Sequence, residues 1–140
     1  MKQRFICVYV CLCTSLFVVG CGTQKDLAAA DVAVARFHQQ LDSQNYVTVY
    51  AQADQKFRDA TKQDDFVALM TAVQSKLGQV GSTTRKSYFV NYNTSGSQIR
   101  VNYATKFGAG DAEEEFVWSK NGDDLALLGY HINSVALITK

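Results

Sequence analysis

All four cysteines of this 140-residue chain lie within its first 21 residues, at positions 7, 11, 13 and 21. Residues 22–140 contain no cysteine, so no disulfide can join two parts of the body. About 120 residues must therefore fold by burying apolar surface alone, and a chain of this length can do so as one domain. The apolar content of 47% is typical of a globular chain rather than a disordered one.

The first 20 residues have the pattern of a secretory signal peptide. Lys2 and Arg4 precede an apolar run over residues 5–19 that only Thr14 and Ser15 interrupt. This run is shorter than the ~20 apolar residues that a membrane-spanning helix needs, so a cleaved leader is favoured. We expect residues 1–20 to be removed, residues 21–25 to form a modified N-terminus with a short linker, and residues 26–140 to form a single domain.

The end of the leader reads Val18-Val19-Gly20-Cys21 and resembles the lipobox of bacterial lipoproteins. The resemblance implies cleavage before Cys21 and a diacylglyceryl group on its thiol, so the chain would be held to a membrane by lipid. Two or more acyl chains give stable anchoring. In that class, Asp after the cysteine retains the protein in the inner membrane; Gly22 stands here, which implies an outer-membrane protein facing the periplasm if the organism is Gram-negative. The alternative is an ordinary secretory leader with an incidental cysteine.

The body divides into a helical half and a strand half. Over residues 26–78, apolar residues recur at steps of three and four, which predicts amphipathic helices. We expect three: one carrying the stripe from Leu27 to Leu41, a second from Tyr46 that continues to Phe57 after a bend, and a third opened by a capping box of Thr61 and Asp64. Gly78 stands where a helix end favours a left-handed residue.

Over residues 80–140 the apolar pattern changes to a period of two, which Phe89 interrupts, and this predicts strands. The clearest strand covers residues 98–107, and Asn121-Gly122 predicts a tight hairpin. The last strand is expected to run from Leu125 to about Ile138, with a bend near Gly129. The expected fold class is therefore α+β, with three N-terminal helices packed on a curved four-stranded antiparallel sheet.

The order and lengths of these elements resemble the cone-shaped fold of nuclear transport factor two, in the cystatin-like class. Two segments also resemble a group of small bacterial lipoproteins of unknown function. One contains Asn45-Tyr46 to Tyr50 with Phe57-Arg58 and Asp65-Phe66, and the other is residues 128–134. The resemblance covers roughly residues 26–138 and implies the fold without a catalytic signature. Cone folds often hold a pocket between sheet and helices, and some are isomerases or dehydratases.

Charge and motifs exclude several classes of function. Without Lys2 and Arg4, 12 basic residues face 13 acidic ones, so no basic surface exists to neutralise phosphates and nucleic acid is not an expected partner. Two histidines without a cysteine in the body make no zinc pattern, and Gly78-Gln79-Val80-Gly81 lacks the ending of a phosphate loop. We expect no metal, no cofactor and no catalytic residue.

Five residues are the candidates for lining a pocket in the cone. They are His38, Tyr50, Tyr103, Trp118 and His131. Either histidine can titrate near neutral pH and act as a base, or can simply be a hydrogen-bonded structural residue. The aromatic side chains can line a cavity or fill the core. The run Glu113-Glu114-Glu115 is interpreted as a solvated strand edge.

These observations predict a membrane-anchored envelope lipoprotein whose domain is a non-enzymatic binding module. Its partners are the membrane, through the lipid on Cys21, and an envelope protein. The alternative is a carrier or isomerase-like enzyme that uses the pocket for a small ligand of unknown identity, with His38 or His131 as the base.

Overall fold

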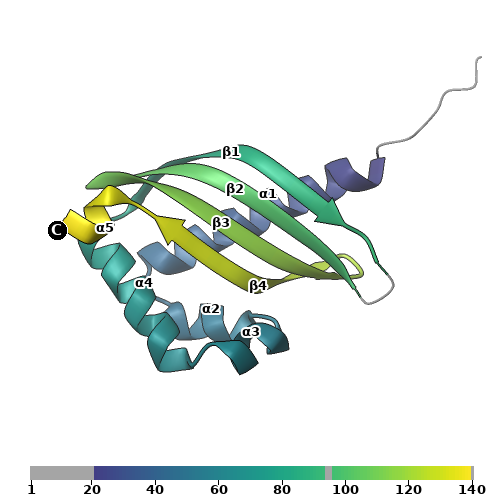
Figure 1. Cartoon of the computed structure of the whole chain (residues 1–140), viewed down its shortest axis with the longest axis horizontal. Coiled ribbons are helices and arrows are strands. Elements are labelled where there is room, and N and C mark those ends of the chain that lie inside the picture. Colours follow the sequence, from purple (N-terminus) through teal and green to yellow (C-terminus); the bar gives the residue numbers. More distant parts are fainter. Residues whose placement is uncertain (1–20, 94–95, 140) are drawn as a thin grey trace, which may run out of the picture.

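A long helix crosses one face of a four-stranded sheet, and three shorter helices lie beside the sheet's last strand (Figure 1). The computed structural model describes residues 21–93 and 96–139. The leader, including Val18, Val19 and Gly20 of the lipobox pattern, lies outside the described residues. The helical elements are α1 (Cys21–Asp42), α2 (Tyr46–Gln52), α3 (Gln55–Ala60), α4 (Gln63–Leu77) and α5 (Val135–Thr139).

The sheet is a simple antiparallel meander. Its strands are β1 (Val80–Asn91), β2 (Ser97–Phe107), β3 (Gly110–Asn121) and β4 (Asp124–Asn133), paired in the order β1-β2-β3-β4. The register shifts between Arg85 and Ser87 in β1, and between Val117 and Trp118 opposite β4. The second shift leaves Leu128 without a partner beside Gly129, close to the expected bend.

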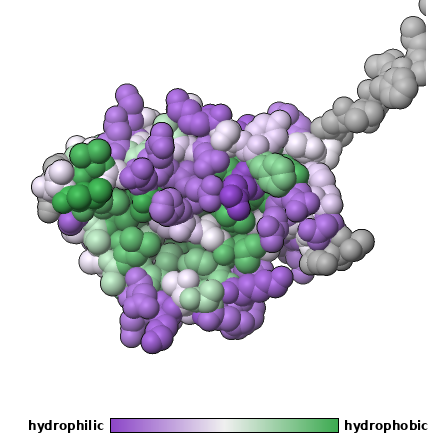
Figure 2. Space-filling model, viewed as in Figure 1, coloured by the Kyte–Doolittle hydropathy of each residue, from purple (hydrophilic) through white to green (hydrophobic). Residues whose placement is uncertain are grey.

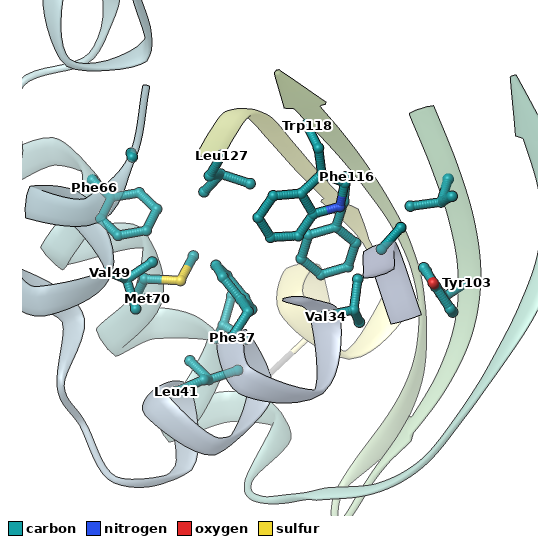
Figure 3. Packing of buried hydrophobic residues seen from close by; sticks show 14 of the residues in the cluster. Val34, Phe37, Leu41, Val49, Phe66, Met70, Tyr103, Phe116, Trp118 and Leu127 are labelled. Atoms are coloured by element: carbon teal, nitrogen blue, oxygen red, sulfur yellow. The ribbon is translucent and has the colours of Figure 1, made fainter. Parts of the chain in front are cut away.

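The core lies between α1 and the inner face of the sheet, which confirms the α+β class and the four antiparallel strands. The α1 stripe is buried as its spacing predicted, with Ala30, Val34 and Leu41 at most 2% exposed. Phe37 meets Phe116 edge-on, with ring centroids 5.1 Å apart, and Phe116 stacks on Trp118 at 5.8 Å. Figure 3 shows these rings filling the space between the helix and the strands.

The prediction of three helices before the sheet was wrong, because the second expected helix is two helices. Ala53 adopts an extended conformation that ends α2, and the Asp54 side chain accepts a hydrogen bond from the Lys56 N–H to begin α3. The expected capping box is also absent: Thr61 ends α3, and Lys62 precedes α4 without a side-chain cap. The spacing of apolar residues did not show this break between α2 and α3.

The first helix and the last strand have other bounds than the sequence predicted. Residues 21–25, expected as a linker, are the first residues of α1. The last strand ends at Asn133 rather than near Ile138, because Ser134 turns the chain and donates a hydrogen bond of 2.6 Å to the Asp111 carbonyl. The apolar residues that follow form α5 instead. Their sequence, VALIT, is also compatible with a strand, which is why the strand was expected to continue.

Glycines with positive φ stand at the end of α4 and in the β3–β4 hairpin, as the sequence predicted, but the hairpin turn lies one residue later than Asn121-Gly122. Gly78 ends α4 with φ of 77°. Gly122 has φ of 64° in the β3–β4 hairpin, where Asn121 pairs with Asp124 and the two turn residues are therefore Gly122 and Asp123.

Candidate functional site

A fully buried carboxylate lies at the centre of the domain. Glu114 on β3 is 1% exposed, and three side chains from three other elements contact it. Its Oε1 accepts a hydrogen bond from the Tyr130 hydroxyl at 2.7 Å. Its Oε2 lies 2.5 Å from the Thr105 hydroxyl and 2.8 Å from His38 Nε2. The carboxylate thus links α1, β2 and β4 through one residue.

Strand alternation places Glu114 inside. Ala112, Glu114, Phe116 and Trp118 face the core in turn, whereas Glu113 is exposed. The expectation that the whole glutamate run forms a solvated edge was therefore wrong for Glu114. The signal was present in the sequence, because a glutamate between inward-facing apolar positions of a strand must either be buried with partners or break the pattern.

His38 connects this carboxylate to a groove at the surface. His38 uses one ring nitrogen, Nε2, for the contact with Glu114 and turns the other, Nδ1, toward the surface. Nδ1 lies 3.4 Å from the Thr83 hydroxyl, and Thr83 belongs to edge strand β1. Both residues line an open space of about 520 Å³ between α1 and β1, which we name the α1–β1 groove.

The α1–β1 groove also holds an ion pair. Arg85 donates to Asp31 at 2.8 Å, and the Tyr103 hydroxyl donates to the same carboxylate at 2.6 Å. Burial and the neighbouring Asp31 carboxylate raise the pKa of the Tyr103 hydroxyl. Burial and the Glu114 carboxylate likewise raise the pKa of Tyr130, so both hydroxyls stay protonated donors near neutral pH.

A second hollow lies between α1 and α2 on one side and the β3–β4 hairpin on the other, which we name the α1–β4 cleft. It encloses about 450 Å³. Phe37, Val49, Trp118, Leu125 and Leu127 supply apolar walls. The polar lining consists of Arg36, Gln40, Gln52, Asp54, Ser119, Asn121 and Asp124.

One wall of the α1–β4 cleft is fixed by Asp54. Its backbone N–H donates to the Leu127 carbonyl at 2.8 Å, and its carboxylate accepts from the Ser119 hydroxyl at 2.5 Å. Hydrogen bonds from Ser119 and from the Lys56 N–H lower the pKa of Asp54. In contrast, Arg36 makes no ion pair or side-chain hydrogen bond with any residue of 21–93 or 96–139.

The outer face of the sheet differs from these hollows. Figure 2 shows this face as predominantly hydrophilic, with apolar surface gathered along its β4 side and at α5. On β4, Leu128 is partly exposed, and Val135 and Ile138 of α5 are 75% and 82% exposed.

The five expected pocket residues do not form one site. His38 and Tyr103 line the α1–β1 groove, and Trp118 lines the α1–β4 cleft. The Tyr50 hydroxyl donates to the carbonyls of Arg58 and Thr61 and joins α2 to α3. His131 is exposed on the outer face of the sheet, where its strand partner is Glu115. Sequence reasoning missed Glu114, Thr83, Arg36 and Asp54.

A comparison with protein families identifies the chain. A family model described as a protein of unknown function, DUF4019, matches residues 33–130, which include the C-terminal part of α1, all of α2 to α4 and nearly all of the sheet. The chain belongs to the DUF4019 family. No curated protein matches it. The matched range contains the whole Glu114 network and every lining residue of the α1–β4 cleft, so both features belong to the DUF4019 domain.

Two further findings concern the part of the DUF4019 chain that the structure describes. Among residues 21–93 and 96–139, no helix is both long and apolar enough to cross a membrane. Within the same residues, no three histidine, cysteine, aspartate or glutamate side chains gather in a metal-binding arrangement.

Proposed function

We propose that this protein is a lipid-anchored envelope protein whose domain binds a short extended segment of another envelope protein in the α1–β4 cleft. The proposal has two parts, the anchor and the binding site. The order of helices and strands also supports placing the domain in the cone-shaped class of nuclear transport factor two.

The anchor is supported by the leader and by its position relative to the fold. A basic start, an apolar run and the Val18-Val19-Gly20-Cys21 pattern together favour acylation of Cys21. Cys21 itself belongs to α1, so no linker separates it from this helix. A lipid on Cys21 would therefore hold the domain directly against the bilayer surface.

The observation that carries the binding function is the chemistry of the α1–β4 cleft. Its volume of about 450 Å³ lies within the ~300–1,000 Å³ range of ligand sites, and it combines apolar walls with a few polar groups. Arg36 has no partner within the described chain, so its guanidinium is free to pair with a carboxylate. Glu114, by comparison, is buried, and its carboxylate is already hydrogen-bonded to His38, Thr105 and Tyr130.

The polar lining suits a peptide. The amide side chains of Gln40, Gln52 and Asn121 each offer a donor and an acceptor, which is what backbone amides require. Gln40 and Gln52 meet only at 3.4 Å, a long hydrogen bond that a ligand can replace. An apolar side chain of the segment would contact Val49 and Leu125, and an acidic group would reach Arg36.

Site-specific photo-cross-linking in cells tests this binding site. A photoreactive residue at Gln52 reports on the cleft, and the same residue at exposed Gln79, between α4 and β1, is the matched control. We expect a reproducible adduct from position 52 that Arg36→Glu weakens, and none from position 79. Equal adducts from both positions, or none from position 52, would contradict the binding site.

The anchor is tested separately by Cys21→Ser. We expect this variant to remain unprocessed and without the added lipid mass that the detergent-extracted wild-type protein shows. Unchanged processing, mass and membrane fractionation in the variant would show that the thiol is not the attachment point.

A second candidate is an acid–base enzyme of the same fold class, with its ligand in the α1–β1 groove. The contacts from Glu114 through His38 to Thr83 favour it, because they orient an imidazole nitrogen toward an accessible hydroxyl. This function would be established if the wild-type protein and His131→Gln turn over a small carbonyl compound and His38→Gln does not. Purified protein without turnover across such compounds favours the binding function.

A further inference from the structure

Three large aromatic side chains are exposed at the end of edge strand β1. Tyr88 is 54% exposed, Phe89 63% and Tyr92 53%, although residues of this size are normally buried. We name these three residues the aromatic end. The opposite end of β1 carries small polar residues instead, with Ser82 and Thr84 exposed.

The aromatic end lies beside the first turns of α1. The Tyr92 hydroxyl donates to Asp26 Oδ2 at 2.7 Å, and Lys120 Nζ lies 2.7 Å from the other oxygen of the same carboxylate. Asp26 follows Cys21 by five residues, which is about 7.5 Å along a helix axis at 1.5 Å per residue. Figure 1 shows the start of α1, the end of β1 and the β3–β4 hairpin at the same end of the molecule.

The contact between Asp26 and its two partners fixes this end of the molecule. Asp26 is 3% exposed, so the carboxylate is held between Tyr92 of the segment after β1 and Lys120 of β3. Burial opposes its ionisation, but the hydrogen bonds from Lys120 and Tyr92 outweigh that effect and lower the pKa of Asp26. The hydrogen bond to Asp26 thus joins Tyr92 of the aromatic end to α1, five residues after Cys21.

We propose that the aromatic end lies in the head-group layer of the membrane to which Cys21 is anchored. This inference rests on the proposed lipid anchor. Tyrosine and other amphipathic aromatic residues favour the boundary between lipid and water, where the ring contacts acyl carbons and the hydroxyl contacts water. Because α1 begins at Cys21 without a linker, acyl chains on that residue bring the neighbouring aromatic side chains to the same boundary.

The arrangement sets how the domain stands on the membrane. With the aromatic end on the lipid, the β2–β3 turn, α5 and the end of α4 point away from the bilayer (Figure 1). Exposure of Phe89 on the outer face of the sheet and of Tyr92 beside α1 lets both faces of β1 meet lipid.

Fluorescence of single-cysteine variants tests the inference. The lipidated protein, whose body has no cysteine other than acylated Cys21, receives one cysteine at Phe89, labelled with a polarity-sensitive dye. A cysteine at Gln79, exposed at the other end of β1, is the matched control. Both are reconstituted in phosphatidylethanolamine–phosphatidylglycerol vesicles that contain brominated lipid. When the protein is placed in these vesicles, we expect the emission of the dye at position 89 to shift to shorter wavelength and to be quenched. We expect the emission of the dye at position 79 to stay unchanged.

The outcomes separate the inference from the anchor. Equal emission at the two positions in protein whose intact mass shows the lipid would overturn the membrane contact and leave the anchor standing. Absence of the lipid mass would overturn the anchor itself. A blue shift at position 89 in lipid-free protein together with a dimeric mass by light scattering would assign the aromatic end to self-association and overturn the inference. If Phe89→Cys does not fold, Tyr88→Cys gives the same test.

Discussion

Replacing Glu114 with alanine should destabilise the domain more than any other substitution in the glutamate run. The change leaves three buried donors without their acceptor: His38 Nε2 and the hydroxyls of Thr105 and Tyr130. Each unpaired buried group costs about 1–3 kcal/mol. Thr105 can turn partly toward the Thr83 hydroxyl, 3.5 Å away, and loss of the buried charge removes its desolvation cost.

These opposing effects leave an expected loss of about 4 kcal/mol in the free energy of unfolding, in the range found when one partner of a buried pair is removed. At a urea dependence of about 2 kcal/mol per molar, the unfolding midpoint should fall by about 2 M. Circular dichroism during urea titration measures it. Glu114→Gln retains one acceptor oxygen and should fall between wild type and Glu114→Ala.

The neighbouring residue supplies the control. Glu113 is exposed and Glu113→Ala should change stability by no more than ~0.5 kcal/mol. A midpoint for Glu114→Ala within about 0.25 M of that for Glu113→Ala, at the same urea dependence, would refute the view that the carboxylate holds α1, β2 and β4 together.

Three further outcomes are expected. Asp54→Asn should be less stable than wild type at pH 7 but should lose less stability on acidification. The lowered pKa of Asp54 stabilises the folded protein above the ordinary aspartate pKa near 3.8, and this stability is lost as pH falls through the folded pKa. Urea midpoints of both proteins from pH 6 to 2.5 measure the effect, and the same pH dependence in both would contradict it. Phe116→Ala should lower the free energy of unfolding by about 3–5 kcal/mol, because it leaves a cavity between Phe37 and Trp118. Calorimetry measures the change, and an unfolding transition like that of wild type would disprove this packing role. Gly110→Ala places a Cβ 2.9 Å from the Ala136 Cβ, which is too close, so α5 must shift. Hydrogen exchange should therefore become faster across α5 and remain unchanged in α2. Unchanged exchange in α5 would show that the packing of Ala136 against Gly110 does not hold α5 in place.

The sequence predicted those elements whose apolar period is long and regular. The α1 stripe from Leu27 to Leu41 and the alternation from Ile99 to Phe107 each settle both the type of element and its buried face. The two short helices could not be resolved in this way, because the break at Asp54 depends on Leu127 and Ser119, which lie about 70 residues away in the chain. A contact of that range leaves no local pattern.

The candidate site was predicted less well than the fold. His38 was predicted to line a pocket or to be a hydrogen-bonded structural residue, but its partner Glu114 was assigned to the surface because three consecutive glutamates suggest solvent exposure. Position within the strand decides otherwise, since Phe116 two residues later must face inward. His131 illustrates the reverse case, where a bulge at Leu128 shifts the strand and leaves the imidazole outside.

The bonds of Asp54 to β3 and β4 have a thermodynamic consequence for the α1–β4 cleft. A wall that is already hydrogen-bonded before any ligand arrives has little conformational entropy left to lose on association. Binding there should resemble rigid-body docking, with a heat-capacity change explained by the contact area alone. Because this wall is rigid, the cleft should bind only ligands whose shape matches the opening that it has before binding.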